Sequence, residues 1–236
     1  MFVPNYNSLY KKYANQSLDW CPMDTEILYD KNYKERFELL ESNGWLNSKF
    51  KYTFNSHGFR CDEFTEHSTI MFLGCSHTMG IGLPIETVWS SIVAKKLNMH
   101  YANLAIGGSA SDTAFRLCHG WIDKVKPKIV IFLEPPGFRI ELVNDHHSNI
   151  INVNNTAYLN FIKEWNYSDD NTYFNSQKNQ LAIKALCQDR KIDYFHFKSS
   201  QLTDYALDLA RDLAHSGPKT HQCFADYVVD KINRFS

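Results

Sequence analysis

The sequence predicts an α/β protein, a three-layer α/β/α sandwich with a mostly parallel sheet. From about residue 68 onward, short apolar runs alternate with segments of helical period, which is the pattern of strands connected by crossover helices. Polar or glycine-containing clusters end most of these runs. The chain has 236 residues, of which 44% are hydrophobic, enough to bury a sizeable core. Parallel sheets are covered on both faces, so three layers are expected.

Four short apolar runs are the predicted strands. They are "STIMFLG" (68–74), "HYANLAI" (100–106), "PKIVIFLE" (127–134) and "IDYFHF" (192–197). The second run stops at Gly107-Gly108 and the third at Pro135-Pro136. Glycine and proline at these places end the strand pattern.

Four segments between and after the strands are predicted helices, at 86–98, 111–125, 175–190 and 217–235. In the first, Val88, Ile92 and Leu97 recur at helical spacing. The second opens with Ser111 and Asp112, which are typical capping residues. Pro218 suits the first turn of the last helix.

The first 65 residues hold aromatic and charged side chains without clean periodicity. We therefore divide the chain into an N-terminal extension packed on the core (1–65) and an α/β domain (66–236). No internal repeat is visible.

The composition argues against several classes of protein. Net charge is −1 and no block of like charge stands out, so neither a nucleic-acid surface nor a membrane-binding patch is expected. The six cysteines are scattered without a C-x-x-C pair, so we expect no metal site and no cofactor. The N-terminus lacks the apolar core of a signal peptide, and no run reaches the roughly 20 apolar residues of a membrane span. We expect a soluble cytoplasmic protein with reduced thiols, and the Asn-, Lys- and aromatic-rich composition suggests a virus or bacterium.

The chemistry begins where the first strand ends, in "GCSHTMGIG" (74–82). Ligands of parallel α/β folds bind beyond the carboxyl ends of the strands, and polar clusters fall at three such ends, 74–78, 107–113 and 134–139. The stretch matches neither a P-loop nor a dinucleotide fingerprint. A nucleophile remains, with Ser76, Cys75 and His77 as candidates, although a serine in such a turn is often only a turn former.

A nucleophilic hydroxyl needs a general base, and the base needs a group that orients it. Asp212 and His215 are three residues apart, just before the last helix. In a tight turn this spacing lets the carboxylate accept a hydrogen bond from the imidazole and hold its tautomer. His221 is a second nearby imidazole without an acid at comparable spacing. Alternatively, Asp212 is a helix cap and His215 is a surface imidazole.

Taken together, these blocks resemble the SGNH hydrolases, the GDSL-type esterase family. The nucleophile block is similar to "GCSHTMGIG", the second block to "NLAIGGSASDT", and the last D-x-x-H block to "DLAH". "FNSHGFRCDEF" is similar to a segment that precedes the nucleophile strand in many members. The resemblance covers most of residues 53–222 in the family's order and implies an SGNH/flavodoxin-like fold.

The resemblance implies roles for particular residues. Ser76 would be the nucleophile, His215 the base and Asp212 its orienting partner. The backbone N–H groups of Ser76 and Gly108 would stabilise the oxyanion, and Asn103 would tie down the turn of the second block.

Two departures from the family's pattern shape the hypotheses. Cys75 stands where the family has Asp before the nucleophile, and "FLEPPGFRIE" supplies no Asn where the third block has its oxyanion donor. Arg139 is the nearest substitute donor. Cys75, His77, Asn103, Glu134 and Arg139 are the expected pocket residues, although Glu134 and Arg139 could instead form a salt bridge at the sheet edge.

The leading hypothesis is a serine ester hydrolase acting on a small acyl ester, such as an O-acetyl group on a carbohydrate. Two alternatives stay open: a binding module on a degenerate esterase fold, and an acyltransferase that uses the same three residues. The polar loop 139–158 is expected to border the pocket.

Overall fold

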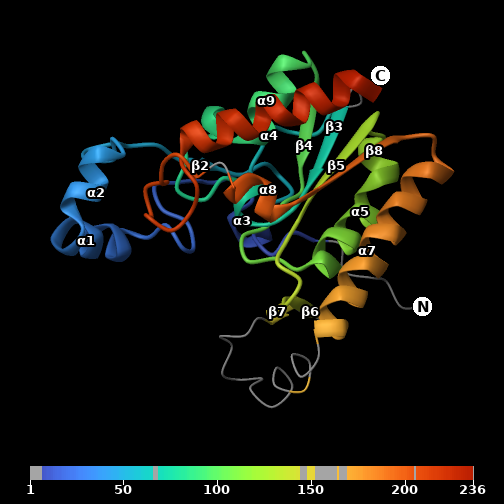
Figure 1. Ribbon diagram of the computed structural model, residues 1–236, viewed down its shortest axis with the longest axis horizontal. Coiled ribbons are helices and arrows are strands. Elements are labelled where there is room, and N and C mark those ends of the chain that lie inside the picture. Colours follow the sequence, from blue (N-terminus) through green and yellow to red (C-terminus); the bar gives the residue numbers. More distant parts are fainter. Residues whose placement is uncertain are drawn as a thin grey trace.

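A four-stranded parallel sheet forms the centre of the computed structural model (Figure 1). The structure describes residues 7–65, 69–143, 148–151, 164, 169–204 and 206–235. The strands lie in the order β4-β3-β5-β8, and their bounds are β3 (Thr69–Leu73), β4 (His100–Asn103), β5 (Ile129–Glu134) and β8 (Asp193–Lys198). Each neighbouring pair is parallel. This confirms the predicted class and the four predicted strands, with shifts of a few residues at their ends.

Helices cover both faces of the sheet and complete the three layers (Figure 1). The pair on one face is α4 (Trp89–Lys96) and α9 (Pro218–Phe235), and the pair on the other is α5 (Ser111–Val125) and α7 (Asp169–Asp189). The helices of each pair contact each other as well as the sheet. Pro218 is the first residue of α9, as expected from its fixed φ.

The central strand β3 fills both cores because its side chains alternate between the two faces. Ile70 and Phe72 pack toward α4 and α9, and the ring of Phe72 meets that of Trp89 at a centroid distance of 5.1 Å. Met71 and Leu73 pack toward α5 and α7. All five β3 residues are buried, which explains why the strand has no polar face in the sequence.

The predicted helix at 86–98 is interrupted in the structure. A 3₁₀ helix η2 (Ile85–Thr87) comes first, Val88 is extended, and α4 then begins at Trp89. The Trp89 N–H donates to His221 Nδ1 at 3.1 Å, so a side chain from α9 binds the donor that a continuous helix would have used.

The start of α5 also differs from the prediction. Its N-cap is Ala110, whose N–H is bound by the Thr113 hydroxyl at 3.3 Å, so Ser111 and Asp112 are not caps. Their side chains instead accept hydrogen bonds from the Asn179 amide of α7, each at 2.9 Å. The two residues therefore hold α7 against α5.

Short elements complete the chain. An antiparallel hairpin joins β6 (Ile140–Val143) to β7 (Ser148–Ile151) inside the segment expected to be a polar loop, of which 144–147 and 152–158 lie outside the described residues. The short helices near the sheet are α3 (Ser76–Met79) and α8 (Ser199–Thr203). None of the described helices combines the length and apolarity that crossing a bilayer requires.

The N-terminal residues add aromatic side chains to both cores. Their elements are η1 (Lys11–Tyr13), β1 (Ser17–Leu18), α1 (Glu26–Glu35), α2 (Phe37–Ser42) and β2 (Tyr52–Thr53). Tyr52, Phe54 and Phe59 pack in the cluster of Met71, whereas Trp45 packs in the cluster of Ile70. Figure 1 shows α1 and α2 together at one end of the molecule, away from the four-stranded sheet. The boundary at residue 65 stays a prediction.

Candidate active site

Ser76 lies on a sharp turn from the central strand into α3, of which it is the first residue. A Cβ on Gly74 would lie 2.3 Å from Thr78 Oγ1 and 3.0 Å from the Leu133 carbonyl oxygen, so only glycine fits this turn. Gly80 ends the helix with a φ of 83°, in the left-handed region that favours glycine. The glycines of this block are therefore explained by the turn that presents Ser76 at the carboxyl end of β3.

The backbone N–H groups of Ser76 and Gly108 lie at this turn and the next one, and neither has a hydrogen-bond partner within the described parts of the chain. First-turn N–H groups of a helix have no partner inside the helix, which accounts for the first. Gly108 has a φ of +75°, and no atom lies within 4 Å of the place where its Cβ would be. The Ser109 hydroxyl donates to the Gly74 carbonyl at 2.9 Å, which docks this second turn on the nucleophile turn. Both expected oxyanion donors are thus unoccupied and neighbouring, and their role stays a prediction.

Asp212 and His215 form a buried hydrogen-bonded pair. His215 Nδ1 lies 2.5 Å from Asp212 Oδ2, and the N–H groups of Ala214 and His215 donate to Asp212 Oδ1 at 3.1 Å. Leu213 has a φ of 53°, a conformation that costs free energy in a branched residue and closes the turn. The carboxylate and the imidazole thus meet within one turn. With the proton of Nδ1 toward Asp212, Nε2 is the nitrogen that can accept a proton, and the orienting role of Asp212 stays a prediction.

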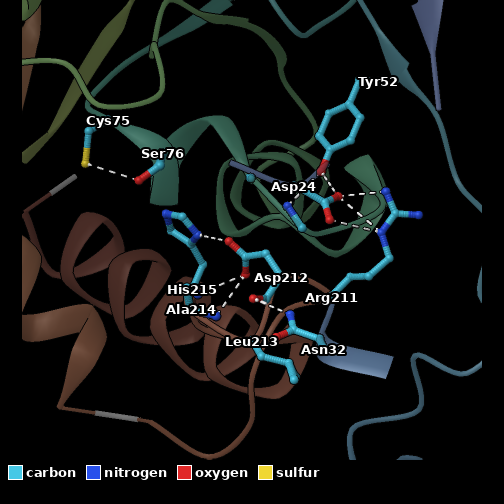
Figure 2. Close-up of polar contacts among 12 residues, drawn as sticks. Asp24, Asn32, Tyr52, Cys75, Ser76, Arg211, Asp212, Leu213, Ala214 and His215 are labelled. Atoms are coloured by element: carbon cyan, nitrogen blue, oxygen red, sulfur yellow. Dashed lines mark hydrogen bonds and ion pairs between the residues drawn. The ribbon is translucent and has the colours of Figure 1, made fainter. Parts of the chain in front are cut away.

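The imidazole lies between Ser76 and Asp212 (Figure 2), but no hydrogen bond joins Ser76 to His215. The Ser76 hydroxyl instead points toward Cys75 Sγ, 4.0 Å away. The ring of His77, the next residue, packs on that of His215 at a centroid distance of 5.1 Å. Catalytic hydrogen bonds are often long or poorly aligned in ligand-free proteins and tighten when substrate binds.

Asn103, the first residue of the second block, makes side-chain contacts with α3, α4 and its own turn. Its amide donates to the Thr78 carbonyl at 2.8 Å and to the Ser90 hydroxyl at 3.2 Å, and its own oxygen accepts the Ala105 N–H at 3.1 Å. Because Asn103 is fully buried, these bonds satisfy groups that water cannot reach. Its role is to hold the backbone around Ser76.

Glu134 and Arg139 do not form the salt bridge considered from the sequence. Glu134 instead accepts from His196 Nε2 at 2.7 Å, and His196 Nδ1 meets the Gln180 amide at 3.1 Å. Arg139 donates to the Ser109 carbonyl at 3.4 Å, and its buried Nε has no partner within the described residues. Its guanidinium therefore lies at the backbone of Ser109, the residue after Gly108, and no ion pair of Arg139 with an acid occurs in the described parts of the chain.

Three imidazoles gather around the site, those of His77, His215 and His221. The pKa of His77 is lowered from 6.5 to about 4, first by burial and then by the neighbouring His215 and Arg139, whereas the Asp212 carboxylate acts in the opposite direction. Burial also lowers the pKa of His221. With such lowered pKa values both rings are neutral at pH 7. At acid pH, protonating them while they stay buried costs free energy.

The free energy of unfolding should therefore decrease as the pH is lowered. Between the unfolded pKa of 6.5 and the folded value of about 4, the unfolded chain binds a proton at His77 that the folded chain does not. Stability is then lost as pH drops below 6.5, by up to about 1.4 kcal/mol per pH unit for one such group. Urea unfolding at about pH 7 and about pH 5 should show a smaller difference in His77→Gln than in the wild type. His119→Gln, on an exposed part of α5, is the control, and equal pH dependence in wild type and His77→Gln would contradict the assignment.

No group of three or more His, Cys, Asp or Glu side chains suited to holding a metal ion occurs in the described parts of the chain. Cys75 is buried beneath the turn with its Sγ toward the Ser76 hydroxyl.

The sequence did not indicate that N-terminal side chains donate hydrogen bonds to the backbone of the loops that carry the site. Asn32 donates to the Asp212 carbonyl at 3.1 Å, and Arg60 donates to the backbone carbonyls of Met79, Gly80 and Leu83. The only signal in the sequence was the position of Arg60 inside "FNSHGFR", where the resemblance reaches upstream of the first strand.

No profile of a known family and no curated protein matches the sequence. Among solved structures, the chain is similar to the psychrotrophic esterase EstA from Pseudoalteromonas sp., with 16% identity over 71% of this chain and 98% of that one and a TM-score of 0.39. It is also similar to a family two carbohydrate esterase from Clostridium thermocellum (17% identity, 71% and 64%, TM-score 0.39) and to the acetyl xylan esterase Est2A from Butyrivibrio proteoclasticus (14%, 79% and 67%, TM-score 0.41).

Proposed function

We propose that the protein is a serine ester hydrolase acting on a small acyl ester, with Ser76, His215 and Asp212 as its catalytic residues. The observation that carries the proposal is the buried 2.5 Å contact between His215 and Asp212 beside a serine on a strand-to-helix turn. A carboxylate that fixes one imidazole nitrogen leaves the other to act as a base.

The reaction follows from these positions. Ser76 Oγ attacks the ester carbonyl carbon while His215 Nε2 takes the hydroxyl proton, and the carbonyl oxygen becomes an oxyanion. The N–H groups of Ser76 and Gly108 are the proposed donors to it. His215 then gives its proton to the departing alcohol. Water, activated by the same imidazole, releases the acyl group and restores Ser76.

Arg139 is proposed as the third donor, in place of the Asn that the family's third block would supply. Its guanidinium lies at the Ser109 carbonyl, one residue from Gly108, and its Nε is unpartnered within the described residues. Because an oxyanion donor acts mainly in the transition state, Arg139→Gln should lower kcat by about 10²-fold with little change in KM.

Steady-state kinetics with p-nitrophenyl acetate would measure this, with the exposed α9 residue Arg234→Gln as the matched control. A rise in KM at unchanged kcat would contradict the role and make Arg139 a substrate-binding residue instead.

The substrate class is proposed from the exposure of the site. Ser76 is 3% exposed and His215 6%, and we expect a small acyl group to reach such a buried hydroxyl more readily than a long chain. An acetyl group suits such a site, and we propose O-acetyl groups on a carbohydrate as the substrate.

The test compares hydrolysis of p-nitrophenyl acetate and p-nitrophenyl butyrate by the wild type, together with labelling by a fluorophosphonate. We expect faster turnover of the acetate, and one phosphonyl adduct on the peptide that contains Ser76. Deacetylation of acetylated xylo- or cello-oligosaccharides would then test the alcohol part. No turnover and no adduct would overturn the proposal.

A second candidate is a binding module on a degenerate esterase fold. The missing Ser76–His215 hydrogen bond and the missing third-block Asn favour it. If the protein is a binding module, calorimetry should detect binding of an acetylated oligosaccharide, and no acetate should be released. Acyl transfer to a sugar hydroxyl would use the same residues as hydrolysis, and the ratio of transferred to free acetate in the presence of a sugar acceptor would separate the two.

A further inference from the structure

Two loops must keep a fixed relative position if Ser76 and His215 are to work together. The first, residues 80–84, follows α3 and is called the nucleophile loop here. The second, residues 209–216, contains Asp212 and His215 and is called the acid–base loop. They touch at Gly82, whose carbonyl accepts the Arg211 N–H at 3.0 Å. A Cβ on Gly82 would lie 2.8 Å from Ala210 Cβ and 3.2 Å from Asp212 Oδ1. The contact is therefore as close as backbone geometry allows.

A buried carboxylate from the N-terminal part of the chain connects to both loops (Figure 2). Asp24 Oδ2 accepts the Tyr52 hydroxyl at 2.5 Å, and the same hydroxyl accepts the Gly82 N–H at 2.8 Å. Arg211 Nε and Nη2 donate to Asp24 at distances of 2.7 to 3.2 Å. Asp24 thus reaches the nucleophile loop through Tyr52 and the acid–base loop through Arg211.

We propose that Asp24 and Tyr52 are positioning residues, which set the nucleophile loop and the acid–base loop in catalytic register; this rests on the proposed esterase function. Asp24 orients the Tyr52 hydroxyl, since a hydrogen donated to the carboxylate leaves an oxygen lone pair for the Gly82 N–H. Burial raises the pKa of Tyr52, and the adjacent Asp24 charge raises it further, so the hydroxyl stays a donor.

The cost of this arrangement argues for a specific role. The side chains of Asp24 and Arg211 are 1% and 3% exposed, and the Arg211 guanidinium is stacked between the rings of Trp20 and Phe50 at 4.1 and 4.0 Å. Buried ion pairs are often replaceable by apolar residues without loss of stability, so stability alone does not explain one. Apolar residues in place of Asp24 and Arg211 would remove the hydrogen bonds that fix the two loops relative to each other.

Neighbouring N-terminal side chains act on the same two loops. Arg60 binds three carbonyls around the end of α3 and lies over the Tyr52 ring at 4.2 Å. Arg36 donates to the Leu213 carbonyl at 3.4 Å, inside the acid–base turn. The link through Asp24 reaches both loops, at the Gly82 N–H through the Tyr52 hydroxyl and at the Arg211 guanidinium directly.

The test uses the full chain and the variant Tyr52→Phe, which keeps the ring over Arg60 and removes only the hydroxyl. Misplacement of reacting groups by a fraction of an ångström to one ångström costs up to about 10²-fold in rate. We expect kcat for p-nitrophenyl acetate to fall by about 10- to 100-fold with KM within about twofold of the wild type. Asp24→Asn, which keeps an acceptor but removes the charge, should act in the same direction with a smaller effect.

Tyr101→Phe is the matched control, because its hydroxyl bonds only the Ser91 side chain and it should leave kcat unchanged. Amide hydrogen exchange is the second readout. The proposal expects faster exchange confined to 80–84 and 209–216 in Tyr52→Phe. Unchanged kcat in Tyr52→Phe, or faster exchange throughout the chain that accounts for the lost activity, would overturn it.

Hydrogen exchange also separates this inference from the proposed function. If the wild type hydrolyses no ester, the esterase proposal fails, and the link is judged by exchange alone. Faster exchange in the two loops of Tyr52→Phe then supports the link, and unchanged exchange there refutes it.

Discussion

Ser76→Ala is expected to lower kcat/KM for p-nitrophenyl acetate by about 10³- to 10⁶-fold, the range seen when a catalytic serine is removed. Without the hydroxyl no acyl-enzyme forms, and only the backbone donors and the imidazole remain to assist water. Because Ser76 is small and its hydroxyl has only a 4.0 Å contact with Cys75 Sγ, the fold should keep its stability. Initial rates and fluorophosphonate labelling of the purified variant would measure the loss.

Cys75→Ala is the control for this variant. Cys75 is buried behind the turn and adjacent in sequence, so the substitution makes a similar change in volume next to the proposed nucleophile. We expect its kcat/KM to stay within a few-fold of the wild type. Activity lost only in Cys75→Ala would move the nucleophile by one residue, and loss in both would point to a damaged turn.

The sheet could be predicted from the sequence because its signal is local. The run of β3 is apolar at every position since both faces are covered, and the glycine that ends it is required by the close approach of Thr78. The contact between Asp212 and His215 was also predictable, because the two residues meet within one turn. Contacts between residues only a few positions apart can be predicted because the local backbone conformation determines them.

Contacts between distant segments could not be predicted. Asp24 and Arg211 are 187 residues apart, and neither stands in a periodic pattern. Arg211 adjoins Asp212, but an arginine there is also compatible with an exposed position. The partner of Glu134 was missed for the same reason, since only the pairing of β5 with β8 brings His196 within 2.7 Å of it.

Local rules failed where tertiary contacts compete with them. Ser111 and Asp112 have the composition of a helix cap, yet Asn179 of α7 takes both side chains. The helix predicted at 86–98 is broken because His221 binds the Trp89 N–H. In both cases a side chain from another helix supplies the bond that the sequence pattern had assigned to the helix itself.

Asp212→Asn is expected to lower kcat/KM by about 10⁴-fold while the protein stays folded. The amide oxygen can still accept the N–H groups of Ala214 and His215, which preserves the turn. Its NH₂ group would then face His215 Nδ1 and donate to it. The imidazole would carry its proton on Nε2, where it could not accept the proton of Ser76. The measurement is kcat/KM for p-nitrophenyl acetate alongside urea unfolding of the same preparation.

Asp208→Asn makes the same chemical change four residues away. Asp208 accepts the N–H groups of Lys219 and Thr220 and so caps the start of α9, outside the proposed reaction. This variant should lose at most about 1 kcal/mol of stability, as expected for a change at a cap, and should keep its activity. If Asp212→Asn retained more than about a tenth of the wild-type rate while remaining folded, its carboxylate would be a turn-forming group and the imidazole would need no orienting charge.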